Sequence, residues 1–138
     1  MANIFEQIRQ RAAWGDAHAQ YHFGIAYYRG RGVAQDFTAA FPWYAKAAEQ
    51  GHTYAEWQLG RMYLFGFGVP RNTFMAHVWL SIAIKNGLNT RGHRFSRFLV
   101  GLFLTKQQRA DSARRLQAWW DARPQQVVVA CAGPPSDV

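Results

Sequence analysis

The chain has 138 residues, 49% of them apolar and 16% aromatic, with a formal net charge of +8. This composition can bury a core of one-domain size and argues against a disordered chain. The longest uninterrupted apolar run, Phe98 to Leu104, is far shorter than the roughly 20 residues that span a bilayer, so no transmembrane helix is expected. Glu6, Arg9 and Arg11 interrupt the apolar stretch that a signal peptide needs, which predicts a cytoplasmic protein.

The positive charge is concentrated in the C-terminal third. Between Lys85 and Arg115 lie eight lysines and arginines, opposed by the single acidic residue Asp111. This imbalance favours an acidic partner. Cys131 is the only cysteine, so an intrachain disulfide is impossible and no thiolate zinc site can form.

An N-terminal helix is predicted before two copies of one unit, at about residues 15–50 and 51–86, which repeat at a spacing of 36 residues. Gly15, Gly51 and Gly87 mark this spacing. Nine further pairs of small, aromatic and apolar residues keep the same register: Ala19 and Ala55, Gly24 and Gly60, Tyr27 and Tyr63, Gly30 and Gly66, Gly32 and Gly68, Val33 and Val69, Ala40 and Ala76, Trp43 and Trp79, Ala47 and Ala83.

Each unit is predicted to be a helical hairpin. The first helix spans about residues 16–28 and ends at a glycine turn that begins with Gly30, because glycine adopts the left-handed conformation without steric cost. Asp36 is expected to cap the second helix, and Asn72 holds the same place one repeat later. Pro42 predicts a kink or a late start of this second helix.

Small residues are expected to let neighbouring helices approach closely while Trp43 and Tyr27 fill the space between them. The small residues concerned are Ala19, Gly24, Ala40, Ala47 and Ala48. Since one such unit cannot bury its apolar face alone, the units should stack into an all-α solenoid.

A helical cap is predicted over residues 87–123, followed by a flexible tail at 124–138. Thr105 and Gln108 have the spacing of a capping box that opens the last helix, which runs to about Trp120. The preceding helix carries an apolar face made of Phe95, Phe98, Leu99 and Leu102. Phe95 and Phe98 of this face are expected to form the core of the cap together with Trp119 and Trp120.

Residues 12–87 resemble the Sel1-like repeat, whose motif occurs twice. The first copy is carried by Ala19, Phe23-Gly24, Tyr27, Gly30-Arg31-Gly32-Val33, Asp36, Ala40, Trp43, Ala47-Ala48 and Gly51. The second is carried by Ala55, Leu59-Gly60, Tyr63, Gly66-Phe67-Gly68-Val69-Pro70, Asn72, Ala76, Trp79, Ala83 and Gly87. The resemblance implies an α/α superhelix related to tetratricopeptide repeats that serves as an adaptor or scaffold, or as an inhibitor of another protein. It implies no catalytic residues and leaves the partner open.

The first helix of each unit has positions outside this motif, which are expected to line a concave groove for an acidic or aromatic-containing peptide. An ordinary solvated face is the alternative. The positions are His18, His22, Ile25 and Arg29 in the first unit, Tyr54, Gln58, Arg61 and Phe65 in the second, and Thr90, Arg94, Arg97 and Gly101 in the cap. The residues selected as partner-binding are His18, His22, Arg29, Tyr54, Gln58, Arg61, Phe65, Arg94 and Arg97.

No enzymatic activity, cofactor or metal is predicted. His18 and His22 stand one helical turn apart, the spacing of two zinc ligands, but they lack the further ligands that zinc requires. His52, His77 and His93 are interpreted as structural residues of turns or helix surfaces. No catalytic triad, carboxylate pair or phosphate-binding loop is present in the sequence.

Two alternatives concern the partner. The basic cap could bind nucleic acid, with Arg94, Arg97 and Arg109 contacting phosphates. The chain could also self-associate through apolar surface at the ends of the solenoid: Ile4, Phe5 and Ile8 at one end and Trp119 or Trp120 at the other.

Overall fold

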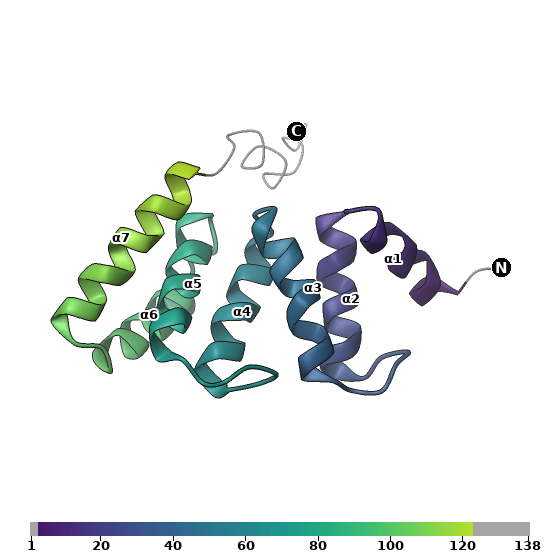
Figure 1. Cartoon of the computed structure of the whole chain (residues 1–138), viewed down its shortest axis with the longest axis horizontal. Helices are drawn as coiled ribbons and strands as arrows, with labels where there is room; N and C mark the ends of the chain where they lie inside the picture. The colour runs from purple at the N-terminus through teal and green to yellow at the C-terminus, as the bar shows by residue number, and fades with distance from the viewer. Residues whose placement is uncertain (1–2, 123–138) are drawn as a thin grey trace.

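The computed structural model describes residues 3–122, a row of antiparallel helices that stack side by side along the long axis of the molecule (Figure 1). Seven helices make up this part of the chain: α1 (Ile4–Ala13), α2 (Ala17–Arg29), α3 (Phe37–Glu49), α4 (Thr53–Phe65), α5 (Thr73–Lys85), α6 (Arg91–Leu102) and α7 (Lys106–Ala122). The predicted all-α solenoid is therefore confirmed. The proposed tail at 124–138 lies outside the described residues.

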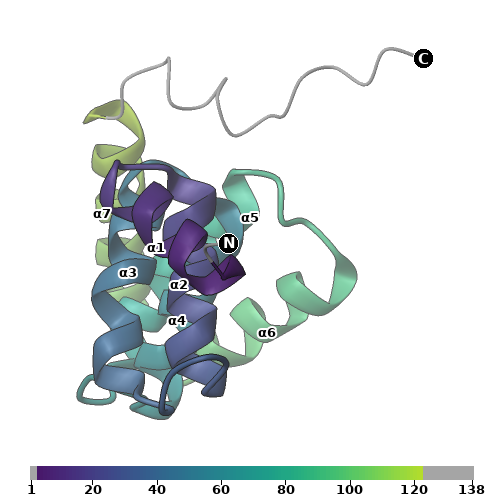
Figure 2. The same ribbon diagram turned by 90° about the vertical axis from the view of Figure 1, so that its right-hand side faces the viewer.

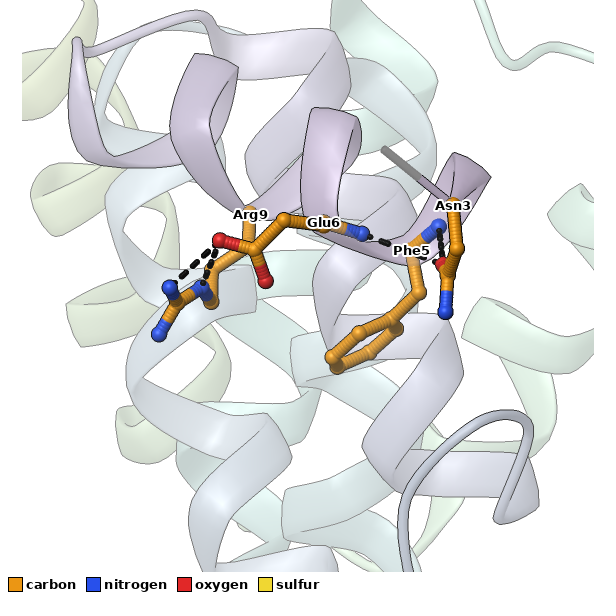
Figure 3. A network of polar contacts seen from close by, with 4 residues as sticks. All are labelled: Asn3, Phe5, Glu6 and Arg9. Carbon is orange, nitrogen blue, oxygen red and sulfur yellow. Dashed lines mark hydrogen bonds and ion pairs between the residues drawn. The ribbon is translucent and has the colours of Figure 1, made fainter. Parts of the chain in front are cut away.

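The first helix, α1, begins with a local network of polar contacts (Figure 3). Asn3 Oδ1 accepts hydrogen bonds from the backbone N–H groups of Phe5, at 2.7 Å, and Glu6, at 3.3 Å. Arg9 Nε donates to Glu6 Oε1 at 3.1 Å one turn later. With this start fixed, Phe5 packs its ring against Phe23 of α2, with the ring centroids 5.2 Å apart.

The predicted helix boundaries of both hairpins agree with the structure to within about two residues. The side chains of Asp36 and Asn72 each cap the next helix by accepting a backbone N–H bond of 3.0 Å, as predicted. Gly30 and Gly66 end α2 and α4 in the left-handed conformation, with φ of 68° and 73°.

Pro42 does not delay the start of α3, so that part of the prediction is wrong. The helix begins at Phe37 and continues through Pro42 to Glu49. Proline removes the donor that the carbonyl of Thr38 would use in a regular helix. Both residues are exposed, so water can replace that donor.

Each hairpin closes by placing a large side chain of its second helix over a glycine of its first. A Cβ on Gly24 would lie 2.8 Å from Cδ1 of Tyr44, and a Cβ on Gly60 would lie 2.6 Å from Cδ2 of Leu80. Tyr44 and Leu80 are themselves 36 residues apart and almost fully buried. The repeated glycines therefore mark the closest approach of the paired helices.

The final helices depart from the regular stack. In Figure 2, α6 extends away from the other helices while α7 returns along the opposite side. The capping box is confirmed, because Thr105 N–H donates to Gln108 Oε1 at 2.9 Å and Gln108 N–H donates to Thr105 Oγ1 at 3.1 Å.

The apolar face of α6 does not form the core of the cap, contrary to the prediction. Phe95, Phe98 and Leu102 are 60%, 59% and 58% exposed, and Leu99 is 41% exposed. α6 instead turns Val100 and its small neighbour Gly101 inward. The side chains of Trp119 and Trp120 lie outside the described part of the structure.

Candidate binding surface

Histidines and tyrosines from the two repeats meet between α2 and the start of α4. His18 Nε2 lies 3.0 Å from His22 Nε2, and His18 Nδ1 lies 3.2 Å from His52 Nε2. The ring of Tyr21 stacks on His52 at 4.5 Å, and its centroid lies 6.2 Å from that of Tyr54. The structure thus brings together three residues selected from the sequence, His18, His22 and Tyr54, and adds His52 and Tyr21 to them.

His52 also has the structural role expected of it, because its Nδ1 accepts the Ala55 N–H at 3.3 Å and caps α4. Burial, together with the neighbouring imidazoles of His18 and His22, lowers the pKa of His52 to about 4. Burial and His18 also lower the pKa of His22. Within residues 3–122, no group of three or more histidines, cysteines or carboxylates is arranged to hold a metal ion.

Acidification should destabilise the protein through His52. The pKa of His52 is lower in the folded chain than the usual value of 6.5, so protonation of this side chain favours the unfolded chain. The contribution of neutral His52 to the free energy of unfolding is therefore complete above pH 6.5 and is lost as the pH falls towards 4. We expect His52 to account for about 1–2 kcal/mol of this loss, allowing for solvent screening of a partly exposed ring. Urea unfolding at pH 7.5 and pH 4.5 measures the loss.

The matched variant for this test is His52→Asn, since asparagine preserves an N-cap acceptor but does not titrate. This variant should lose less stability between the two pH values than the wild type does. An equal loss in both proteins would contradict the assignment to His52.

A second group of aromatic rings lies at the opposite end of α4. Phe65 is 55% exposed and its ring centroid is 5.7 Å from that of Phe67, which stacks on Phe37 at 4.9 Å. Arg29, also selected from the sequence, is exposed at the end of α2. Phe65 and Arg29 are therefore accessible to a partner.

Two selected residues of α4 are less accessible than expected. Gln58 is only 8% exposed, and Arg61 is half-buried with its Nη1 donating to Gln58 Oε1 at 3.2 Å. The reason is the central position of α4, which packs against both α3 and α5. Gln58 therefore presents little surface to a partner, and it orients Arg61.

The selected residues of α6 have different surroundings. Arg94 is exposed, whereas Arg97 is half-buried and lines a pocket of about 190 Å³ together with His77 of α5 and Arg109 of α7. The described lining residues come from α5, α6 and α7, so Arg97 belongs to a second site distinct from the histidine–tyrosine cluster.

His77 is not the helix-surface residue expected from the sequence, since only 9% of it is exposed and its Nδ1 lies 2.7 Å from Ser112 Oγ. The burial of His77 could have been inferred from the 36-residue spacing of the repeats. Position 77 corresponds to Phe41 in the first unit, which packs against the central core.

Two stacked α-hairpins with a 36-residue period and capping helices at both ends define an α/α repeat protein. The Sel1 repeat profile matches residues 17–52 and 53–88, which is more than half of the chain. The chain belongs to the Sel1 repeat family. Proteins of this family are generally protein–protein interaction modules.

Two solved structures are similar to this chain. A protective antigen of uropathogenic Escherichia coli with an SLR fold shares 31% identity over 93% of the chain, with a TM-score of 0.81. A Sel1 repeat protein from Oxalobacter formigenes shares 35% identity over 60% of the chain, with a TM-score of 0.59. The chain spans 27% of the length of the first protein and 63% of the second. No curated protein is similar enough in sequence to be matched.

In the described part of the chain, none of the helices combines the length and the hydropathy that crossing a membrane requires.

Proposed function

We propose that the protein binds another protein, as an adaptor or an inhibitor, through a basic and aromatic groove along α2, α4 and α6. The observation that carries this proposal is the exposure of Tyr54 and Phe65, 57% and 55%, on a helix whose other large apolar residues are buried or only partly exposed. Tyrosine and other large aromatic side chains are typical anchors of protein interfaces.

Cationic and imidazole side chains are the other members of this proposed surface. His18, His22 and Arg29 are exposed on α2, Arg61 is partly exposed on α4, and Arg94 is exposed on α6. Arginine donors bind carboxylates through strong charge-assisted hydrogen bonds. The matching partner is a peptide segment with acidic and aromatic residues.

The test is affinity capture from lysate of the source organism, with and without nuclease treatment and at two salt concentrations. Three forms of the protein serve as bait. The wild type is compared with the reversal Arg29→Glu/Arg61→Glu/Arg94→Glu. The control reverses three arginines on α1, the α4–α5 connection and α7, namely Arg9→Glu/Arg71→Glu/Arg114→Glu, and changes the net charge equally.

We expect the wild type and the control to retain the same protein in stoichiometric amount. The groove reversal should retain at least tenfold less of it. Circular dichroism should show equal helicity in all three baits. Retention of the same protein by the groove reversal would contradict the proposal. Loss of all binding after nuclease treatment would favour the nucleic-acid alternative, and a dimeric mass of the free protein at micromolar concentration would favour self-association.

A further inference from the structure

The pocket between α5, α6 and α7 collects cationic groups without a carboxylate to balance them. Its lining residues in the described structure are His77, Arg97, Phe98, Gly101, Leu102 and Arg109. The acidic residues of α7 are engaged elsewhere, since Asp111 pairs with Arg114 and Asp121 accepts from Gln117. Two guanidinium groups therefore face a volume of about 190 Å³ with no anion from the residues that line it.

Part of the Arg97 side chain is buried and incompletely bonded. Arg97 Nε is inaccessible to solvent and has no hydrogen-bond partner among the described residues. Burying such a donor without an acceptor is unfavourable, and more so when the group is charged. An anion beside the guanidinium group would offset part of this cost by balancing its charge.

The pKa of His77 reflects the same excess of positive charge. Burial and the guanidinium groups of Arg97 and Arg109 lower its pKa to about 4. Its Nδ1 is engaged by Ser112, while its Nε2 lies beside Gly101, where a Cβ would approach it to 3.4 Å. An anion in the pocket would offset the two guanidinium charges and raise the pKa of His77.

The rim of the pocket is apolar. Phe98 and Leu102 line the pocket and are more than half exposed. They continue into an apolar face on α6 that includes Phe95, Leu99 and Phe103. The cations of the pocket are the half-buried Arg97 and the exposed Arg109. Together with the exposed apolar side chains they match a ligand that carries an anionic group next to an apolar one.

We propose that this pocket binds the carboxylate of an acidic side chain from a protein partner, whose neighbouring apolar residue packs on Phe98 and Leu102. Arg97 and Arg109 hold the two carboxylate oxygens, and His77 lies beside them. This assignment rests on the proposed protein-binding function in one respect, which is that a protein supplies the carboxylate.

The surroundings favour a protein over a nucleic acid. A nucleic-acid backbone is bound by cations spread along a track, with one contact to each phosphate. Here Arg97 of α6 and Arg109 of α7 converge on one pocket, whose other α6 side chains are the apolar Phe98 and Leu102. Its volume of about 190 Å³ suits a single side chain. An amphipathic segment with a glutamate or aspartate beside an aromatic residue complements both features.

The experiment is an NMR titration of the full chain at constant ionic strength, with the Arg Nε–Hε, His77 and Gly101 signals as readouts. The probe is 3-phenylpropionate, whose carboxylate and phenyl group imitate the proposed side-chain pair. The neutral 3-phenylpropionamide and inorganic phosphate are the comparison probes. Arg109→Gln and Arg97→Gln test the pocket, and Arg91→Gln, at an exposed site on α6 outside both the pocket and the groove, is the matched control.

We expect saturable shifts with 3-phenylpropionate and a rise in the pKa of His77 when it binds. Binding should be at least tenfold weaker in Arg109→Gln and Arg97→Gln but not in Arg91→Gln. No shift in the wild type, or equal shifts with the amide, would overturn the proposal. Tighter binding of phosphate would overturn the assignment to a carboxylate and favour a phosphorylated ligand. Because these probes need no partner, failure of the lysate capture leaves this result standing, and the reverse also holds.

Discussion

Replacing Gly68 by alanine is expected to destabilise the protein by about 3 kcal/mol or more. A Cβ at this position would lie 2.4 Å from the carbonyl oxygen and 2.6 Å from the carbonyl carbon of Phe37. These are backbone atoms at the start of α3, which cannot move aside as a flexible side chain does. The φ of Gly68 is 74°, in the left-handed region that alanine also disfavours.

The matched control is Gly66→Ala in the same turn. Gly66 has nearly the same φ, 73°, but its nearest neighbour would be Arg71, 3.5 Å from the added Cβ. Only the conformational cost of about 1 kcal/mol applies there. Urea unfolding of the three proteins measures the difference, and similar losses in the two variants would show that the contact with Phe37 is not limiting.

The turn around Gly68 shows what the repeat pattern predicts and what it omits. Equal spacing of Gly32 and Gly68 correctly indicated two equivalent turns, because the same local conformation recurs in each unit. It did not indicate what each turn touches. A Cβ on Gly32 would meet the ring of Phe5 at 3.2 Å, whereas one on Gly68 would meet the backbone of the preceding repeat.

The exposed apolar face of α6 also shows that a sequence pattern predicts local structure but not what packs against it. The spacing of Phe95, Phe98 and Leu102 correctly predicts an amphipathic helix. Burial of that face depends on whether a further element packs against it, which spacing cannot determine. In the repeats each apolar face has a following helix to cover it, but α6 packs its opposite side on α5 and leaves this face open.

The candidate sites were only partly predictable for a related reason. Motif analysis separates core positions from variable ones, and the positions that it selected include His18, Tyr54 and Phe65, which are exposed. It could not bring His52 next to His18, or His77 next to Ser112, since those contacts join separate helices. Side chains that meet across 34 or 35 residues require the packing of the hairpins to be known.

A buried polar pair that recurs in both repeats was also hidden from the sequence. Gln50 Nε2 donates to Gln20 Oε1 at 2.8 Å in the first unit. In the second unit, Asn86 Nδ2 donates to both carboxylate oxygens of Glu56, at 2.7 and 2.8 Å. The 36-residue register relates these two contacts, but both partners differ between units, so a comparison of identical residues does not reveal them.

The substitution Asn86→Asp replaces this amide donor by an acceptor of the same shape. It should destabilise the protein by about 3 kcal/mol at pH 7. Glu56 is completely buried, and the change would place a second carboxylate against it without altering the volume of the side chain. The expected loss should become smaller as the pH falls from 7 to 5, because protonation of one carboxyl group relieves the repulsion and restores a donor.

Chemical unfolding of a double-mutant cycle measures this interaction. The double variant Glu56→Gln/Asn86→Asp exchanges the donor and acceptor roles and should recover at least half of the stability lost in Asn86→Asp. The control Gln50→Glu removes the corresponding neutral contact in the first repeat, where the loss should be nearer 1 kcal/mol. If the double variant were no more stable than Asn86→Asp, the contact between Glu56 and Asn86 would contribute through packing alone, and the hydrogen bond would not be the common element that joins the two helices of each hairpin.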